Sequence, residues 1–256
     1  MAKISAVLNT YNASQYLDRV LDSLSGFDEI LVCDMESTDD TVEIARRHGC
    51  RVVTFERGEH RICEPARDFA IHAAANEWVL VVDADEVVPE ALTRFLYKLV
   101  EAPDCPDAMF VPRSNLFLGK RYYNTTDYQL RFMRKDKAYW PPVIHSHPKI
   151  DGTIGKIPRK HKDLYLIHLD DSPLDKRYQK MESYTDYELQ RRLSKNYGVA
   201  SFMFRPAWFF FRSYILQGGC CDGVRGIIRA YFAMTYQVML MSKIMERRFS
   251  QDSKKK

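Results

Sequence analysis

Three carboxylates lie within four residues, directly after an apolar run. The run covers residues 78–82, and the acids are Asp83, Asp85 and Glu86. Such acids repel one another unless positive charge lies among them. An Asp-x-Asp after a buried strand can give one carboxylate to a divalent cation and the other to a hydroxyl or a metal-bound water, and Mg²⁺ and Mn²⁺ prefer such oxygen ligands. The simpler alternative is that Asp83 and Asp85 end the strand and cap the helix that follows.

Three further segments carry polar side chains at the ends of strand-like runs. "NTYNAS" follows residues 4–8, "DMESTDD" follows residues 29–33, and a segment leading to Arg67 follows residues 51–55. Ligands of open α/β sheets bind where the strands end at their carboxyl edge. We therefore expect these three segments and the acidic cluster to meet at one site.

The elements that must position these residues alternate through the first hundred residues. Four apolar runs suit strands, and helical patterns separate them, with Ser37, Thr38 and Asp39 as capping residues before the second. The helical patterns lie at about residues 17–24, 40–48, 66–73 and 92–99. Strands that alternate with helices predict βαβ units, and therefore an α/β fold with a mostly parallel sheet covered on both faces.

The pattern changes at about residue 105. Short strand-like pieces then alternate with Gly, Pro and charged turns as far as residue 170, which predicts a mixed or antiparallel extension of the sheet. A helical segment follows at about 174–195. We expect residues 1–170 to form one domain with halves 1–103 and 104–170, followed by a basic helical extension over 171–256.

A family resemblance rests on the ordered set of these motifs. The segments "ISAVLNTYN", "EILVCDMESTDDTVEIARRHG" and "WVLVVDADEVVPEAL" resemble family 2 glycosyltransferases of the GT-A fold. Two later segments, "NLFLGKRYYNTTDYQLRFMRKDKAYWPPVIHSHPKIDG" and "RPAWFFFRSYILQGGCCDGVRGIIRAYFAMTYQVML", resemble the bacterial lipopolysaccharide-core β-glucosyltransferase subgroup. The resemblance covers most of residues 3–245. It implies a nucleotide-sugar-binding half over 1–103 and an acceptor-side half over 104–170.

The resemblance also implies roles for single residues. Arg67 would lie near the diphosphate of the donor, and Asp85 would bind a divalent cation, Mg²⁺ or Mn²⁺. A metal and an arginine there would neutralise the charge that develops on the departing diphosphate. The implied donor-binding residues are Asn9, Thr10 and Tyr11 around the base, Asp34 facing the nucleoside, Arg67, Asp83 near the ribose, Ala84 and Asp85. The implied metal ligands are Asp85, Asp83 and His145.

Two positions depart from the family pattern. Many members have a second Asp after the one that matches Asp34, and they use it to bind uracil, whereas this chain has Met35. Glu36 stands where Gly or another small residue is common. The departure at Met35 leaves the identity of the nucleotide open between UDP and others.

Inverting transfer needs a base that takes the proton of the acceptor hydroxyl. We expect Asp127 to be this base, since the subgroup has an Asp just before its Gln-Leu-Arg; the alternative is a turn-forming Asp at a strand start. The subgroup commonly has His-Glu where this chain has His145 and Ser146, so a base at that Glu position is excluded. His145 would instead bind metal or diphosphate, and His161 and His168 complete no zinc spacing.

Basic and aromatic residues concentrate at the end of the chain. Residues 205–256 hold ten Lys and Arg against three Asp and Glu, although the whole chain has a net charge of only +4. With Trp208 and three phenylalanines among them, they suit a helix in a membrane interface, or a helical subdomain packed on the catalytic half. Large aliphatic residues argue against nucleic acid as a partner.

Two compositional features bear on localisation. The six cysteines have no C-x-x-C spacing and suit a reducing compartment. The N-terminal residues enter a strand pattern directly, without a signal-peptide layout. We expect a cytoplasmic protein, peripheral on the inner face of the cell membrane.

Together these features predict a metal-dependent, inverting glycosyltransferase. It would move a hexose from a nucleotide-diphosphate sugar, with UDP as the expected nucleotide, to a glycan or glycolipid acceptor of cell-surface polysaccharide. One alternative is a sugar-phosphate nucleotidyltransferase, although "NTYNASQYL" lacks the Gly-rich loop of that class. The other is a non-catalytic, membrane-bound assembly partner, which Met35 and Ser146 would suit.

Overall fold

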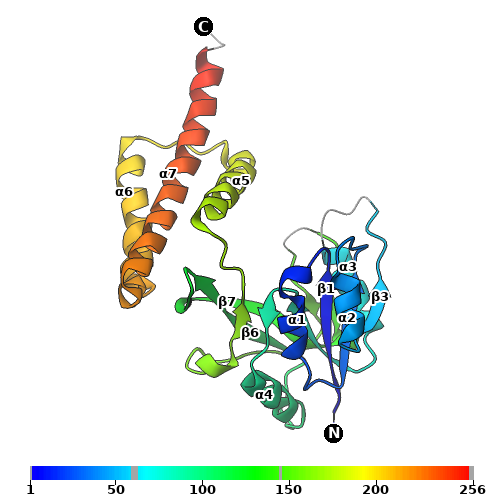
Figure 1. The fold of residues 1–256 in the computed structure, drawn as a ribbon. Helices are drawn as coiled ribbons and strands as arrows, with labels where there is room; N and C mark the ends of the chain where they lie inside the picture. Colours follow the sequence, from blue (N-terminus) through cyan, green and yellow to red (C-terminus); the bar gives the residue numbers. More distant parts are fainter. Residues whose placement is uncertain (1, 59–62, 144–145, 254–256) are drawn as a thin grey trace. The chain divides into compact units, whose positions relative to one another are not determined.

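The computed structural model describes residues 2–58, 63–143 and 146–253. It divides into two compact units, drawn in Figure 1. The first comprises Met1–Leu116 and Thr126–Asp170, and the second comprises Phe117–Thr125 and Asp171–Lys256. Each unit is described by itself below.

The first unit is built on a mixed sheet with the strand order β3-β2-β1-β4-β7-β6-β11-β5. Its first four strands are parallel, and β7 runs antiparallel to β4. Helices α1, α2, α3 and α4 connect the early strands, so the alternation predicted from the sequence is confirmed. The bounds are β1 Ile4–Thr10, α1 Ser14–Asp22, β2 Glu29–Asp34, α2 Thr41–Arg47, β3 Arg51–Thr54, α3 Glu64–Ala73, β4 Trp78–Asp83, β5 Glu86–Val87 and α4 Glu90–Val100.

The rest of the sheet comes from the segment predicted to be a mixed extension. Strand β11 runs parallel to β6 and antiparallel to β5, and β10 also pairs with β6. A separate two-stranded sheet joins β8 and β9. The bounds are β6 Ala108–Phe117, β7 Lys120–Arg134, β8 Ala138–Tyr139, β9 Lys149–Ile150, β10 Ile154–Lys156 and β11 Leu166–His168.

The core of this unit has two layers, one on each face of the sheet. Alternate residues of a strand point to opposite faces, as the two-residue period of a strand requires. Thus Leu80 and Val82 of β4 pack with α1 and α4, while Val79 and Val81 pack with α3. Burial on both faces explains why the parallel strands are continuously apolar up to their carboxyl ends, where the polar residues begin. The predicted fold class, a helix-flanked, mostly parallel mixed sheet of the GT-A type with a helical extension, is confirmed.

The second unit consists of helices and the tip of the β6–β7 hairpin. Its helices are α5 Leu174–Arg192, α6 Val199–Phe211 and α7 Val224–Ser253, with a π-helical turn at Arg212–Leu216 and a 3₁₀ turn at Gly219–Asp222. Helices α6 and α7 run side by side in Figure 1. Their core is a small cluster around Leu189, Leu240 and Met241. Among the helices of the described residues, none is both long and apolar enough to cross a membrane.

Candidate active site

The carboxyl ends of three parallel strands bring the predicted donor residues together. Asn9 of β1 lies opposite Asp83 of β4, and Thr10 lies opposite Asp34 of β2. A cavity of about 390 Å³ opens beside these strand ends. Predicted site residues that line it are Asn9, Tyr11, Asp83, Ala84 and Asp85, and His168 joins them.

Asp83 is held by arginines from two other elements. Its Oδ1 accepts a hydrogen bond of 2.6 Å from Arg67 of α3, and its Oδ2 accepts one from Arg131 of β7. Burial alone would raise the pKa of this carboxyl, but the charges of Arg131 and Arg67 outweigh burial and hold the pKa well below its usual range. Asp83 is therefore ionised, and its orientation is fixed from both sides.

Glu86 is the buried centre of the same charge network. Its carboxylate accepts the backbone N–H of Asp83 at 3.0 Å and Arg113 Nη1 at 3.1 Å, and Arg131 lies 3.7 Å away. Arg113 also donates to Asp127 of β7, so one guanidinium links Glu86 to the predicted base. Although burial opposes it, the pKa of Arg113 is raised by Glu86 and Asp127.

These contacts explain how the acids after β4 lie close together in spite of their mutual repulsion. Asp83, Glu86 and Asp127 share three arginines, Arg67, Arg113 and Arg131, so the positive charge among these acids comes from the protein itself. The sequence pattern predicts a divalent cation in that role. Of Asp83, Asp85, Glu86 and Asp127, it is Asp85 whose ion pairs among the described residues include no arginine.

Asp85 pairs instead with a histidine from the far part of the sheet. Its Oδ2 lies 3.1 Å from His168 Nε2, at the end of β11. His168 Nδ1 lies 2.9 Å from the amide oxygen of Asn115, which can only accept, so Nδ1 carries a proton. Burial would lower the pKa of His168, but the Asp85 carboxylate raises it above the usual value. In the neutral form the remaining lone pair is on Nε2, next to Asp85.

The donor set of Asp85 and His168 fits a divalent cation. A carboxylate oxygen and an imidazole nitrogen point to the same place, and Mg²⁺ or Mn²⁺ usually completes such a site with substrate phosphates. The contact of His168 Nδ1 with Asn115 orients the ring as metal-binding histidines require. Both oxygens of Asp83 already accept from arginines, so its predicted metal contact stays a prediction. His145 lies outside the described residues, among which no group of three ligating side chains forms.

Hydrogen bonds join the loop after β1 to the loop after β2. Asn12 accepts a hydrogen bond from Thr38 N, and its own N–H donates to Ser37 Oγ. Asp39 accepts from the N–H groups of Ser14 and Thr41, at the starts of α1 and α2. Burial would raise the pKa of Asp39, but the hydrogen bonds of Thr41 and Ser14 lower it to about 2.

Two predicted donor residues, Asp34 and Thr10, lie beneath these loops rather than in the cavity. Both are buried, and Thr10 Oγ1 donates to Asp34 Oδ1 at 2.9 Å. Asp34 also accepts from the backbone N–H and the hydroxyl of Ser37. In this structure the two residues fix the loop that carries Met35 and Glu36.

Glu36 and Tyr11 lie at the outer edge of the site. Glu36 has φ of +63°, the left-handed region in which glycine is favoured, and this agrees with the small residue that the family has there. Its carboxylate accepts the N–H of Arg57, whose guanidinium lies 3.7 Å from the centre of the Tyr11 ring. Tyr11 is exposed, and Arg57 covers one face of its ring.

Asn9 has a feature that points to a ligand. Both polar atoms of its carboxamide are buried and lack hydrogen-bond partners among the described residues. The neighbouring Cys33 thiol contacts the Asn9 side chain, but a thiol forms only weak hydrogen bonds. Buried polar groups are normally paired, so Asn9 suits a site that a bound molecule completes.

Sequence reasoning missed three residues of the site. His168 was considered only for zinc spacing, although it ends the run "LYLIH" as Asp83 ends "WVLVVD". Applying the same end-of-strand argument to both runs would have found it. Arg113 and Arg131 lie within strand patterns, where a buried charge indicates a paired partner.

The fold and this site define a class of protein. A mixed sheet with parallel strands first and the site at their carboxyl ends is the GT-A architecture. Residues 1–349 of S. aureus TarS, solved in complex with UDP, share the fold with a TM-score of 0.50 at 15% identity, over 97% of this chain and 92% of that one. This likeness concerns the fold alone.

The family follows from the sequence comparison. The model for glycosyl transferase family 2 matches residues 5–150, more than half of the chain, so the chain belongs to that family and is a glycosyltransferase. It is 24% identical over 253 residues to the lipopolysaccharide core biosynthesis glycosyltransferase LpsC of Rhizobium meliloti, covering 95% of this chain and 92% of LpsC. An uncharacterised glycosyltransferase of Rickettsia conorii is 40% identical over 91 residues, 35% of this chain and 31% of that protein.

Proposed function

We propose that the protein moves a hexose, with inversion, from a UDP-sugar to a glycan or glycolipid acceptor in lipopolysaccharide biosynthesis. One observation carries the proposal: a single cavity is lined by Asn9, Tyr11, Asp83 and Asp85 together with His168. The similarity to LpsC over nearly the full length of both chains supports the acceptor class. The complex of TarS with UDP supports the nucleotide.

Each part of the cavity suits one part of the donor. Tyr11 offers an exposed ring for the base, and Asn9 offers unpaired amide groups. Asp83, oriented by two arginines, would accept hydrogen bonds from ribose hydroxyls. Asp85 and His168 would hold a divalent cation, which when bound would offset negative charge on the diphosphate leaving group.

Asp127 remains our candidate for the base. It accepts hydrogen bonds from Arg113 and Gln129, one on each oxygen. Each carboxylate oxygen has two acceptor sites, so both contacts leave capacity for an acceptor hydroxyl. Arg113 would also orient the carboxylate, as a base requires before it takes a proton.

The helical unit supports membrane association as part of the same proposal. Large apolar side chains repeat every three to four residues along α6 and the π-helical turn, and they are exposed: Val199, Met203, Phe204, Trp208, Phe211 and Ile215. A face of this kind with Trp and Phe beside Arg suits the interface of a bilayer. A lipid-linked acceptor would be reached from such a position, on the cytoplasmic face of the cell membrane.

Turnover of nucleotide sugars tests the proposed function. We expect slow release of UDP from UDP-glucose or UDP-galactose that requires Mn²⁺ or Mg²⁺ and rises when a lipopolysaccharide-core acceptor is added. The variant Asp127→Asn should lower acceptor-dependent release by roughly 10²-fold or more while UDP still binds, since a general base contributes about that much. No release from UDP-, GDP- or dTDP-sugars under any of these conditions would contradict the proposal.

A further inference from the structure

The helical unit contains a second candidate binding site. One cavity there has a volume of about 370 Å³, at the small end of the ~300–1,000 Å³ typical of ligand sites. An adjoining hollow, too tight for a water molecule, shares Phe117, Tyr122 and Arg229 with it. Every lining residue of both belongs to the second unit, and none lines the donor cavity of the first.

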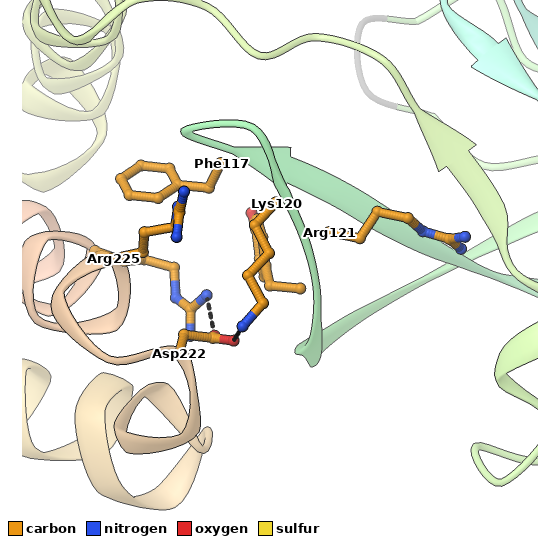
Figure 2. Close-up of a pocket in the computed structure, with 7 residues that line it drawn as sticks. Phe117, Lys120, Arg121, Asp222 and Arg225 are labelled. Atoms are coloured by element: carbon orange, nitrogen blue, oxygen red, sulfur yellow. Dashed lines mark hydrogen bonds and ion pairs between the residues drawn. The ribbon is translucent and has the colours of Figure 1, made fainter.

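Positive charge surrounds the cavity and the hollow beside it. Figure 2 shows Lys120 reaching Asp222 and the Arg225 guanidinium beside Phe117, while Arg121 extends away from this group. Asp222 is the one acid among the described lining residues, and it already pairs with Lys120 at 3.7 Å and Arg229 at 3.0 Å.

The cavity adds two cations to this group. Arg177 lines it and pairs with Asp171 at 3.3 Å, and Lys180 lies at its exposed edge. Among the described lining residues, six are Lys or Arg and one is an acid. The charge therefore favours an anionic ligand.

Arg229 is the residue that points most directly to a ligand. Its side chain is only 11% exposed, and Nη1 donates to Asp222. Nε and Nη2 are buried without a hydrogen-bond partner among the described residues. The guanidinium also lies 4.5 Å from the centre of the Tyr122 ring, which fixes its plane. Two unpaired N–H groups on one guanidinium match the two oxygens of a phosphate or carboxylate.

Aromatic rings form the remaining wall of the cavity. Tyr184, Phe232 and Tyr236 line it with Phe117 and Tyr122. Phe232 is held in place by Tyr178 at 4.5 Å and by Phe117 at 6.3 Å between ring centres. Ligand sites of this kind combine apolar ring surface with a few polar groups that fix orientation. A molecule that fits has an apolar face, a compact size and a negative group at one end.

We propose that this site binds an anionic saccharide, a sugar that carries a phosphate or a carboxylate. Arg229 holds the anionic group, Lys180 and Arg177 add long-range attraction, and the aromatic wall packs on the sugar ring. The identification of this saccharide as part of the acceptor rests on the proposed function, whereas the binding itself does not. The acceptor of the enzyme would then carry a negative charge of its own.

Ligand-detected NMR on the full chain tests the proposal directly. The probes are glucose 6-phosphate, glucuronate and, as the neutral match, glucose. We expect both anionic sugars to bind at least ~10-fold more tightly than glucose. Arg229→Met should weaken their binding at least ~10-fold, and Arg247→Met, an exposed arginine of the same helix, should leave it unchanged. Lys180→Glu should also weaken the binding of the anionic sugars. Because Lys180 is exposed, this variant tests the site even if Arg229→Met fails to fold.

Three results would overturn the inference. Glucose could bind as tightly as the anionic sugars, or the anionic sugars could bind equally to the wild type, Arg229→Met and Lys180→Glu. Vesicles of phosphatidylglycerol could capture the protein in an Arg229-dependent way while the free sugars do not bind, which would assign the site to a lipid headgroup. Mn²⁺-dependent binding of UDP that Asp85→Ala abolishes reports on the donor cavity, so failure here and failure of the proposed function remain distinguishable.

Discussion

The buried charge network after β4 makes a quantitative prediction at Glu86. This side chain is fully buried and accepts from Asp83 N and Arg113. In Glu86→Gln the shape is kept, but the charge is lost and the new NH₂ faces a donor. Removing one partner of a buried pair costs about 3–5 kcal/mol. In the variant, Arg113 still pairs with Asp127 and Arg131 still pairs with Asp83. We therefore expect a loss of unfolding free energy at the lower end of this range, about 3 kcal/mol.

Thermal unfolding measures this change. At roughly 2–4 °C per kcal/mol for a chain of this size, Glu86→Gln should lower the melting temperature by about 6–12 °C. Glu90→Gln is the matched control, because Glu90 pairs with Arg94 at 2.5 Å but both side chains are exposed. Exposed pairs contribute only about 0.2–1 kcal/mol, so this variant should shift by roughly 4 °C at most. Equal shifts for the two variants would refute the reasoning that the network stabilises the site.

Three smaller predictions follow from single contacts. The pKa of Asp39 is lowered to about 2, so the stability that its ionised form contributes is complete above the unfolded pKa of about 3.9 and disappears as the pH falls toward 2. The difference in unfolding free energy between wild type and Asp39→Asn should therefore shrink from pH 5 to pH 3, and a constant difference would contradict this. Glu36→Gly should be at least as stable as Glu36→Ala in denaturant titrations, since φ is +63° there; a clearly less stable Gly variant would disprove the strain argument. A methyl group on Gly226 would lie 1.8 Å from the Gly219 carbonyl oxygen, whereas one on Gly198 would meet nothing within 4 Å. Gly226→Ala should therefore lower the hydrogen-exchange protection of the helical unit and Gly198→Ala should not; equal protection in both variants would contradict this.

The strands and helices of the first unit were predictable because their periodicities are local. Residues 78–82 are apolar on both faces, and this fits only a strand covered on two sides. The polar residues that follow each strand then had to share one edge of the sheet. Asn9, Tyr11, Asp83 and Asp85 do line one cavity at this edge.

The ion pairs were not predictable, because they join elements far apart in the chain. His168 reaches Asp85 only because β11 pairs with β5 and β6. Arg131 reaches Asp83 only because β7 runs antiparallel to β4. The sequence pattern predicted a mixed extension there but not the strand order, and strand order decides which side chains meet.

Asp34 shows the opposite case, a position known from resemblance whose local role the structure changes. The resemblance implies that it faces the nucleoside, and in this structure both its oxygens accept hydrogen bonds from Thr10 and Ser37. Those partners are short polar residues within three positions of a strand end, so the loop closes on itself. Contact with a nucleoside at Asp34 remains a prediction.

The central claim is that Asp85 and His168 complete a nucleotide-diphosphate site, and calorimetric titration of UDP tests it most directly. We expect binding to the wild type that needs Mn²⁺, at least ~10-fold weaker binding to Asp85→Ala and His168→Ala, and no change in Asp104→Ala, an exposed carboxylate outside the cavity. UDP binding that is equally tight without metal, or unchanged in both variants, would contradict the account.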